Sequence, residues 1–165
     1  MSDSIISGFS RNIHKSYAVY NMCFQRMVEK AFSELSVKYQ LKEPLYYSHN
    51  YVLQVIYYQE KPLTLAEISK RSGQALPNVS TAAASLRENE LIICQRLEKD
   101  KRKYAVVLSE KGKNLCDEYL QHYLPEICSI LWEGVPQADF ETTFRTMERA
   151  EANARNYLMK SDYSD

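Results

Sequence analysis

The spacing of apolar residues predicts a chain built mainly from helices. Between Ser10 and Leu41, apolar side chains recur at steps of three and four residues, which is the period of one helix face. The run from Ser48 to Tyr58 shows the same period, with an apolar stripe through Val52, Val55 and Ile56. We therefore expect a long amphipathic first helix followed by a shorter second helix.

The next segment predicts two short helices joined by a turn. Thr64 is a suitable N-cap, and Glu67 stands three residues later, where a capping box requires it. Gly73 should end this helix, and Pro77 suits the first turn of the next one. The inward stripe of that second helix is expected to be Val79, Ala82, Ala83 and Leu86. Two short helices around a glycine-containing turn form a helix-turn-helix motif.

A β-hairpin is predicted directly after this motif. The segments Leu91–Leu97 and Tyr104–Leu108 are rich in strand-forming residues, and the charged run between them makes the turn. Ser109 should then cap a helix that kinks or ends at Pro125, because proline has no backbone N–H to donate.

A last amphipathic helix is predicted from Gln137 to Lys160. The expected fold class is mainly α with a small β-wing, a winged helix-turn-helix flanked by long dimerisation helices. We divide the chain into residues 1–60, with the first dimerisation helix and the second helix, residues 61–112, with the winged helix-turn-helix, and residues 113–165, with the C-terminal dimerisation helices. A length of 165 residues suits one intertwined domain of this kind.

The charges are distributed unevenly along the chain, although the chain as a whole is neutral. The whole chain carries 21 basic and 21 acidic residues. Residues 60–113 contain 11 basic and 7 acidic residues, whereas residues 114–165 contain 4 basic and 10 acidic ones. The basic middle segment fits a polyanionic partner, and the acidic last segment belongs on another face.

The cysteines and histidines do not indicate a metal site or a cofactor. The four cysteines are widely separated without a CxxC pair, and His14, His49 and His122 lie far apart. We expect free thiols in a cytoplasmic protein without a membrane segment, because the N-terminus is not signal-like and no long uncharged apolar run occurs. A glycine-rich phosphate loop, an HExxH motif and a nucleophile elbow are absent from the sequence, so we expect no enzyme and no cofactor.

Three stretches of the middle segment resemble a known family. LTLAEISKRSG, NVSTAAASLRENELI and DKRKYAVVLSEKG, which together span residues 63 to 112, resemble the winged-helix core of the MarR family of bacterial transcription regulators. The wing pattern of that family is matched by Asp100, Lys101, Arg102, Leu108, Ser109 and Gly112. The resemblance implies a homodimer that binds a palindromic DNA operator, typically as a ligand-responsive repressor.

The candidate DNA contacts fall on the second short helix, at its approach, where Gln74 lies, and on the hairpin turn. Hydrogen-bonding side chains suited to base edges and phosphates are Gln74, Asn78, Ser80, Thr81 and Ser85. The hairpin turn adds Asp100, Lys101, Arg102 and Lys103. The resemblance implies that Arg102 enters the minor groove and that Asp100 holds it in place. If these residues do not contact DNA, both sets are ordinary solvated surface. The alternative function for the whole protein is that of a winged-helix adaptor, which binds another protein in place of DNA.

The resemblance also implies that a small aromatic ligand binds between the dimer helices and the winged domain. Candidate residues for that pocket are Tyr17, Tyr20, Tyr46, Tyr47 and Tyr51. Tyrosine combines an apolar ring with one polar tip, which suits an aromatic ligand as well as ordinary helix packing. Cys23 is expected to be a buried, inert thiol, with peroxide sensing as the alternative.

Overall fold

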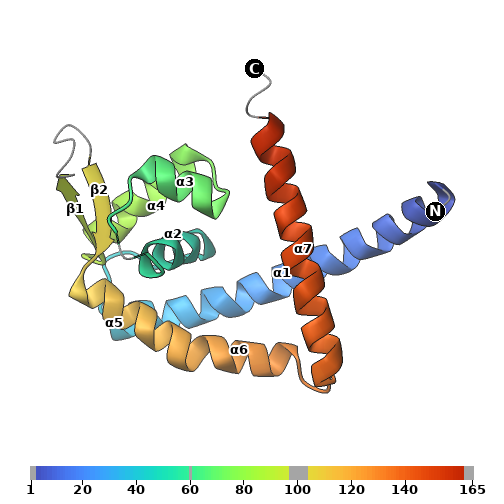
Figure 1. Ribbon diagram of the computed structural model, residues 1–165. Helices are drawn as coiled ribbons and strands as arrows, with labels where there is room; N and C mark the ends of the chain where they lie inside the picture. The colour runs from blue at the N-terminus through green and yellow to red at the C-terminus, as the bar shows by residue number, and fades with distance from the viewer. Residues whose placement is uncertain (1–2, 60, 97–103, 162–165) are drawn as a thin grey trace. The chain divides into compact units, whose positions relative to one another are not determined.

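The computed structural model describes residues 3–59, 61–96 and 104–161 of the chain. The described chain forms two compact units, Met1–Ile127 and Cys128–Asp165, and each is described by itself. Figure 1 labels the α-helices and strands of both units. The division into three regions that the sequence suggested stays a prediction.

Two helices open the first unit. Helix α1 spans Asp3–Lys38, and α2 spans Tyr47–Tyr57. The C-terminal half of α1 buries a stripe of apolar side chains, and its Phe32 ring stacks on Tyr119 with 4.8 Å between the ring centroids. The preceding turns of α1 instead expose large apolar side chains, namely Tyr17, Val19 and Met22.

The helix-turn-helix is confirmed. Helix α3 spans Leu65–Ser72 and α4 spans Leu76–Glu88. The capping box forms as predicted, because the Thr64 hydroxyl accepts from the Glu67 N–H at 3.3 Å and the Glu67 carboxylate accepts from the Thr64 N–H at 2.7 Å. Gly73 ends α3 with a left-handed φ of 71°, which glycine adopts without steric cost. The predicted inward stripe of α4, Val79, Ala82, Ala83 and Leu86, is buried.

The hairpin follows at once (Figure 1). Strand β1 spans Ile92–Arg96 and pairs antiparallel with β2, Tyr104–Leu108. Leu63 joins the outer side of β2, because its N–H and carbonyl both bond to the backbone of Val106, at 3.2 and 2.8 Å. A helix-turn-helix followed by this hairpin makes the first unit a winged helix, as predicted.

The chain then enters a long helical segment with a π turn in it. Helix α5 spans Glu110–Glu118, the π turn η1 spans Tyr119–Tyr123, and α6 spans Leu124–Leu131. The Ser109 hydroxyl caps α5 by accepting from the Gly112 N–H at 2.9 Å. The helical segment does not end at Pro125. The Leu124 N–H donates to the carbonyl of Tyr119, five residues earlier, which is the hydrogen bond of a π turn. The helix therefore changes its hydrogen-bond pattern just before the proline.

The second unit consists mainly of α7, which spans Gln137–Ser161, close to the predicted bounds. Trp132 contacts Phe140 edge to face at a centroid distance of 4.9 Å. Phe140, Phe144 and Met147 are all exposed on the single chain. Among the described residues, no helix is both long enough and apolar enough to cross a bilayer.

Gly112 should be necessary for packing the wing against α5. A Cβ added at Gly112 would lie 2.0 Å from the Leu91 carbonyl oxygen, which also accepts from the Ser109 N–H at 3.0 Å and therefore cannot easily move. Gly112→Ala should lower the free energy of unfolding by about 1–3 kcal/mol or more, the usual cost of overpacking. Urea unfolding measures this, with exposed Asn114→Ala on the same helix as the control. Equal stability of Gly112→Ala and wild type would contradict the packing described.

Candidate nucleic-acid interface

Helix α4 carries a polar row beside its buried stripe. Asn78, Thr81 and Ser85 follow one another at steps of three and four residues, so they lie along one side of α4, and Gln74 precedes the helix, in the turn before it. All four line a cavity of about 760 Å³. Ser80, the fifth predicted contact, is half-buried and lies off this row, because two residues from Asn78 is more than half a turn of helix. The structure thus brings together four of the five predicted residues.

The opposite wall of the cavity comes from the loop before α2 and from the first turn of α2. Its lining residues are Glu43, Pro44, Tyr46, Ser48 and His49. Asn89, which is only 1% exposed, fixes this loop to the end of α4. Its side-chain oxygen accepts from the Glu43 N–H at 3.1 Å, and its amide group donates to the Glu43 carbonyl at 3.0 Å. Both hydrogen bonds together set the spacing between the two walls.

His49 is a buried polar side chain in that wall. Its Nδ1 accepts from the Tyr46 N–H at 2.8 Å, so the neutral ring carries its proton on Nε2. Burial lowers the pKa of His49 below its ordinary value of 6.5, and the hydrogen bond with the Tyr46 backbone opposes this only in part. The imidazole is therefore neutral at pH 7.

Gln74 is held by its backbone at the turn between α3 and α4. Its carbonyl accepts from the Ser69 hydroxyl at 2.7 Å, and its N–H donates to the Ser72 hydroxyl at 3.3 Å. Its side-chain Oε1 is buried and has no hydrogen-bond partner among the described residues. A buried acceptor of this kind costs free energy unless a donor reaches it.

The turn of the wing lies outside the described residues, and with it Asp100, Lys101, Arg102 and Lys103. The base of the wing shows a cation that sequence reasoning missed. Arg96 is exposed at the end of β1, and its guanidinium carbon lies 5.7 Å from the centroid of the Tyr104 ring. The two residues are opposite each other in the strand register, so a hairpin alignment of the sequence could have paired them.

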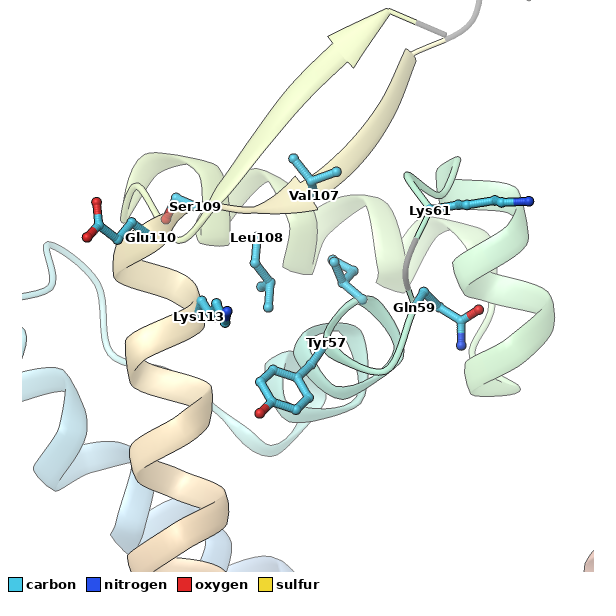
Figure 2. Close-up of a pocket in the computed structure, with 9 residues that line it drawn as sticks. Tyr57, Gln59, Lys61, Val107, Leu108, Ser109, Glu110 and Lys113 are labelled. Atoms are coloured by element: carbon cyan, nitrogen blue, oxygen red, sulfur yellow. The ribbon is translucent and has the colours of Figure 1, made fainter.

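A second cavity, of about 580 Å³, lies at the base of the wing and contains none of the predicted site residues. Figure 2 shows Leu108 and Lys113 pointing into the space between β2, α5 and α2. The Tyr57 hydroxyl, in the same wall, donates to the Asp117 carboxylate at 2.5 Å, and this hydrogen bond is the main cause of the raised pKa of Tyr57. The Tyr57–Asp117 contact joins α2 to α5 and so serves the fold.

The predicted tyrosine pocket is brought together only in part. Along α1 and α2 the rings of Tyr20, Phe24, Tyr47 and Tyr51 form successive contacts with centroid distances of 6.4, 6.3 and 4.9 Å. The Tyr51 hydroxyl donates to the Tyr47 hydroxyl at 2.7 Å, and burial raises the pKa of Tyr47. Tyr17 is exposed on the same helix as Tyr20. Tyr46 lies elsewhere, because it lines the cavity beside α4.

The expectation for Cys23 is wrong for the single chain. Cys23 is exposed, because it lies on α1 before the stripe that packs against the winged helix. The buried thiol is Cys116, whose pKa burial raises to about 12. Among the described residues, no three His, Cys, Asp or Glu side chains are grouped so that they could hold a metal ion.

Comparison with known proteins gives the same class of fold. No protein-family model and no curated protein matches the sequence. A MarR transcriptional regulator from Methanosarcina mazei Go1 superposes with a TM-score of 0.75 at 20% identity, over 89% of this chain and 99% of that one. A mutant MarR from E. coli, complexed with operator DNA, gives 0.72 at 16% identity, over 84% and 93%. A MepR–DNA complex from S. aureus gives 0.65 at 18% identity, over 84% and 96%.

The first unit therefore defines a winged helix-turn-helix protein. More particularly, the chain has the fold of the MarR-family transcription regulators, as its sequence resemblance predicted. These similarities concern the fold, because every identity given above is 20% or less.

Acid should destabilise the wall that contains His49. The pKa of His49 is lower in the folded chain than in the unfolded one. The neutral His49 side chain therefore makes its full contribution to the free energy of unfolding above pH 6.5, and that contribution is lost as pH falls from there toward the folded pKa. The urea concentration at the midpoint of unfolding should fall less between pH 7.5 and 5.5 in His49→Gln than in wild type. His122→Gln, at an exposed position, is the control. The assignment fails if the two variants and wild type lose stability with acid to the same extent.

Proposed function

We propose that the protein is a DNA-binding transcription regulator, a ligand-responsive homodimeric repressor of a palindromic operator. The observation that carries the proposal is the polar row of α4, because α4 is the second helix of a helix-turn-helix, the element that enters the major groove. Structural neighbours solved with DNA support the same assignment.

In this proposal the row of α4 reads base edges. The Asn78 side chain is exposed and has the amide group that pairs with adenine N6 and N7 in the major groove. Thr81 is exposed as well, but its hydroxyl donates to the Pro77 carbonyl at 3.1 Å, so it acts as an acceptor or through its methyl group. The row contains no basic side chain, so the charge that binds phosphates has to come from other elements.

Cations on the elements that pack against α4 would supply that charge. Lys70 and Arg71 are exposed near the end of α3, and Arg96 is exposed at the base of the wing. The turn of the wing adds Lys101, Arg102 and Lys103 in the sequence. We assign Arg102 to the minor groove, where a narrow A·T-rich segment concentrates negative potential, and Asp100 to holding it.

The homodimer is supported by apolar side chains that the single chain leaves uncovered. In the first unit they lie on α1, with Tyr17, Val19 and Met22, and in the second unit on α7, with Phe144 and Met147. A second copy would remove such surfaces from water, and its two-fold symmetry matches a palindromic operator. The effector of this regulator would be a small aromatic molecule at the tyrosines of α1 and α2. The proposed location is the cytoplasm, where the operator is.

A winged-helix adaptor for another protein is the second candidate, and the lack of basic side chains in the α4 row favours it. Salt dependence separates the two functions. A regulator that neutralises several phosphates gains affinity for DNA steeply as salt is lowered, whereas an adaptor does not.

Substitutions in the wing test the proposed DNA contacts. Arg102→Ala should weaken operator binding by about 1–3 kcal/mol, the range for a lost specific arginine contact. Lys101→Ala and Lys103→Ala should each cost less and mainly reduce the salt dependence, because a lysine at a phosphate acts as a counter-charge. Fluorescence anisotropy with labelled operator DNA measures both quantities. If Arg102→Ala binds as wild type does while Ser80→Ala abolishes binding, the wing does not contribute as proposed.

A further inference from the structure

The N-terminal end of α4 carries exposed apolar side chains. Ala75, the N-cap residue, and Leu76 and Pro77, the first two residues of the helix, are all exposed. Leu76 is 45% exposed, although a leucine side chain gains free energy when it is removed from water. The side chains of these three residues have no hydrogen-bonding group. The tip of the second helix of the helix-turn-helix is therefore an apolar surface that faces solvent.

This apolar surface continues along the face of α4 that lies opposite its buried stripe. Pro77, Thr81 and Ala84 follow one another at steps of four and three residues, and all three are exposed. The Thr81 hydroxyl donates to the Pro77 carbonyl, one turn earlier in the helix, at 3.1 Å. Because its proton is used within the helix, the Thr81 hydroxyl cannot donate to a base, and its methyl group remains for apolar contact.

The position of this surface selects DNA bases as its partner. In a helix-turn-helix bound to DNA, the N-terminal residues of the second helix meet base edges in the major groove. Thymine presents a methyl group there, and apolar side chains recognise it by contact. Asn78 follows Pro77 directly, and its amide group suits the adenine of the same A·T pair. Methyl contacts and amide pairing would thus favour the same base pairs.

Other occupants fit this surface less well. The phosphate backbone would gain little from it, because the exposed residues from Ala75 to Thr81 include no cation. A protein partner needs an interface of about 1,000 Å² or more. Here Leu76 is the large side chain, and the remainder of the surface consists of alanine, proline and a threonine methyl group. A small apolar tip of this kind matches single methyl groups better than a protein surface.

We propose that Leu76, Pro77 and the methyl group of Thr81 recognise the 5-methyl groups of thymine in the major groove and thereby help to set which operator the protein selects. This inference rests on the proposed function and names side chains that determine its sequence preference. Such contacts bury apolar surface and neutralise no phosphate, so they add affinity without adding salt dependence.

Uracil-containing operators test the proposal with an unchanged protein. The operator is one that the protein selects from a random-sequence library, and each thymine of a half-site is replaced in turn by uracil, which lacks only the 5-methyl group. Wild type should bind about two- to fivefold more weakly when a contacted thymine is replaced, as expected for one lost methyl contact. Replacement outside the half-sites should leave the affinity unchanged. If no replacement within a half-site weakens binding, the proposal is overturned.

Leu76→Ala assigns the contact to α4. This variant should bind the thymine operator more weakly than wild type does, with the same salt dependence. It should also lose the discrimination between thymine and uracil at one position of each half-site. Val37→Ala, which shortens a side chain that is 78% exposed on α1, is the control and should discriminate as wild type does. If Leu76→Ala also discriminates as wild type does at every position, the proposal is wrong.

A matched pair of variants at Thr81 separates its methyl group from its hydroxyl. Thr81→Ser keeps the hydroxyl and loses the methyl group, whereas Thr81→Val keeps the methyl group and loses the hydroxyl. If the methyl group makes the contact, Thr81→Ser should bind the thymine operator about two- to fivefold more weakly than Thr81→Val. The opposite order would show that Thr81 acts as a hydrogen-bond acceptor, against the proposal.

Failure of the proposed function gives a different result from failure of this inference. A protein that selects no DNA sequence from the library would refute the DNA-binding function and the methyl contacts together, and would assign the apolar surface of α4 to a protein partner. A protein that selects an operator but binds its thymine and uracil forms equally would refute the methyl contacts alone.

Discussion

The hydrogen bonds of Asn89 hold the part of the molecule on which the candidate site depends. Asn89 follows the last residue of α4 and is almost completely buried, and its side chain bonds to both backbone groups of Glu43, 46 residues earlier. Its own carbonyl also accepts from the Lys111 ammonium at 3.2 Å, so α5 is joined to the same point. Asn89 thereby connects the end of α4 to the loop before α2 through its side chain and to the start of α5 through its backbone carbonyl.

The buried stripe of α4 sets the direction of its polar row. Val79, Ala82, Ala83 and Leu86 fix the rotation of the helix, and two of the four are alanines, which permit a close approach to neighbouring helices. Since the rotation is fixed, Asn78 and Thr81 are exposed while Ser85 is half-buried. The proposed reading of DNA follows from this one orientation.

Local signals in the sequence predicted most of the fold. The capping box of Thr64 and Glu67, the glycine at the end of α3, the stripe of α4 and the cap at Ser109 depend on residues three or four apart, and all of them formed. Features that depend on distant residues were not predictable in this way. The Asn89 contact with Glu43 is one, and the separation of Tyr46 from Tyr47 is another, because adjacent residues at a helix start face different neighbours. The exposure of Cys23 depends on where α1 leaves the winged helix.

Selection of DNA from a random-sequence library by the purified protein tests the central claim most directly, with wild type and Asn78→Ala in parallel. The account predicts that wild type enriches a palindrome whose half-sites lie about one helical turn, roughly 10 base pairs, apart. Asn78→Ala should enrich the same spacing with a weakened preference for adenine at one position of each half-site, because its amide group would no longer pair there. Enrichment of no motif by wild type, or of an identical motif by Asn78→Ala, would contradict the account of α4 as the helix that reads DNA.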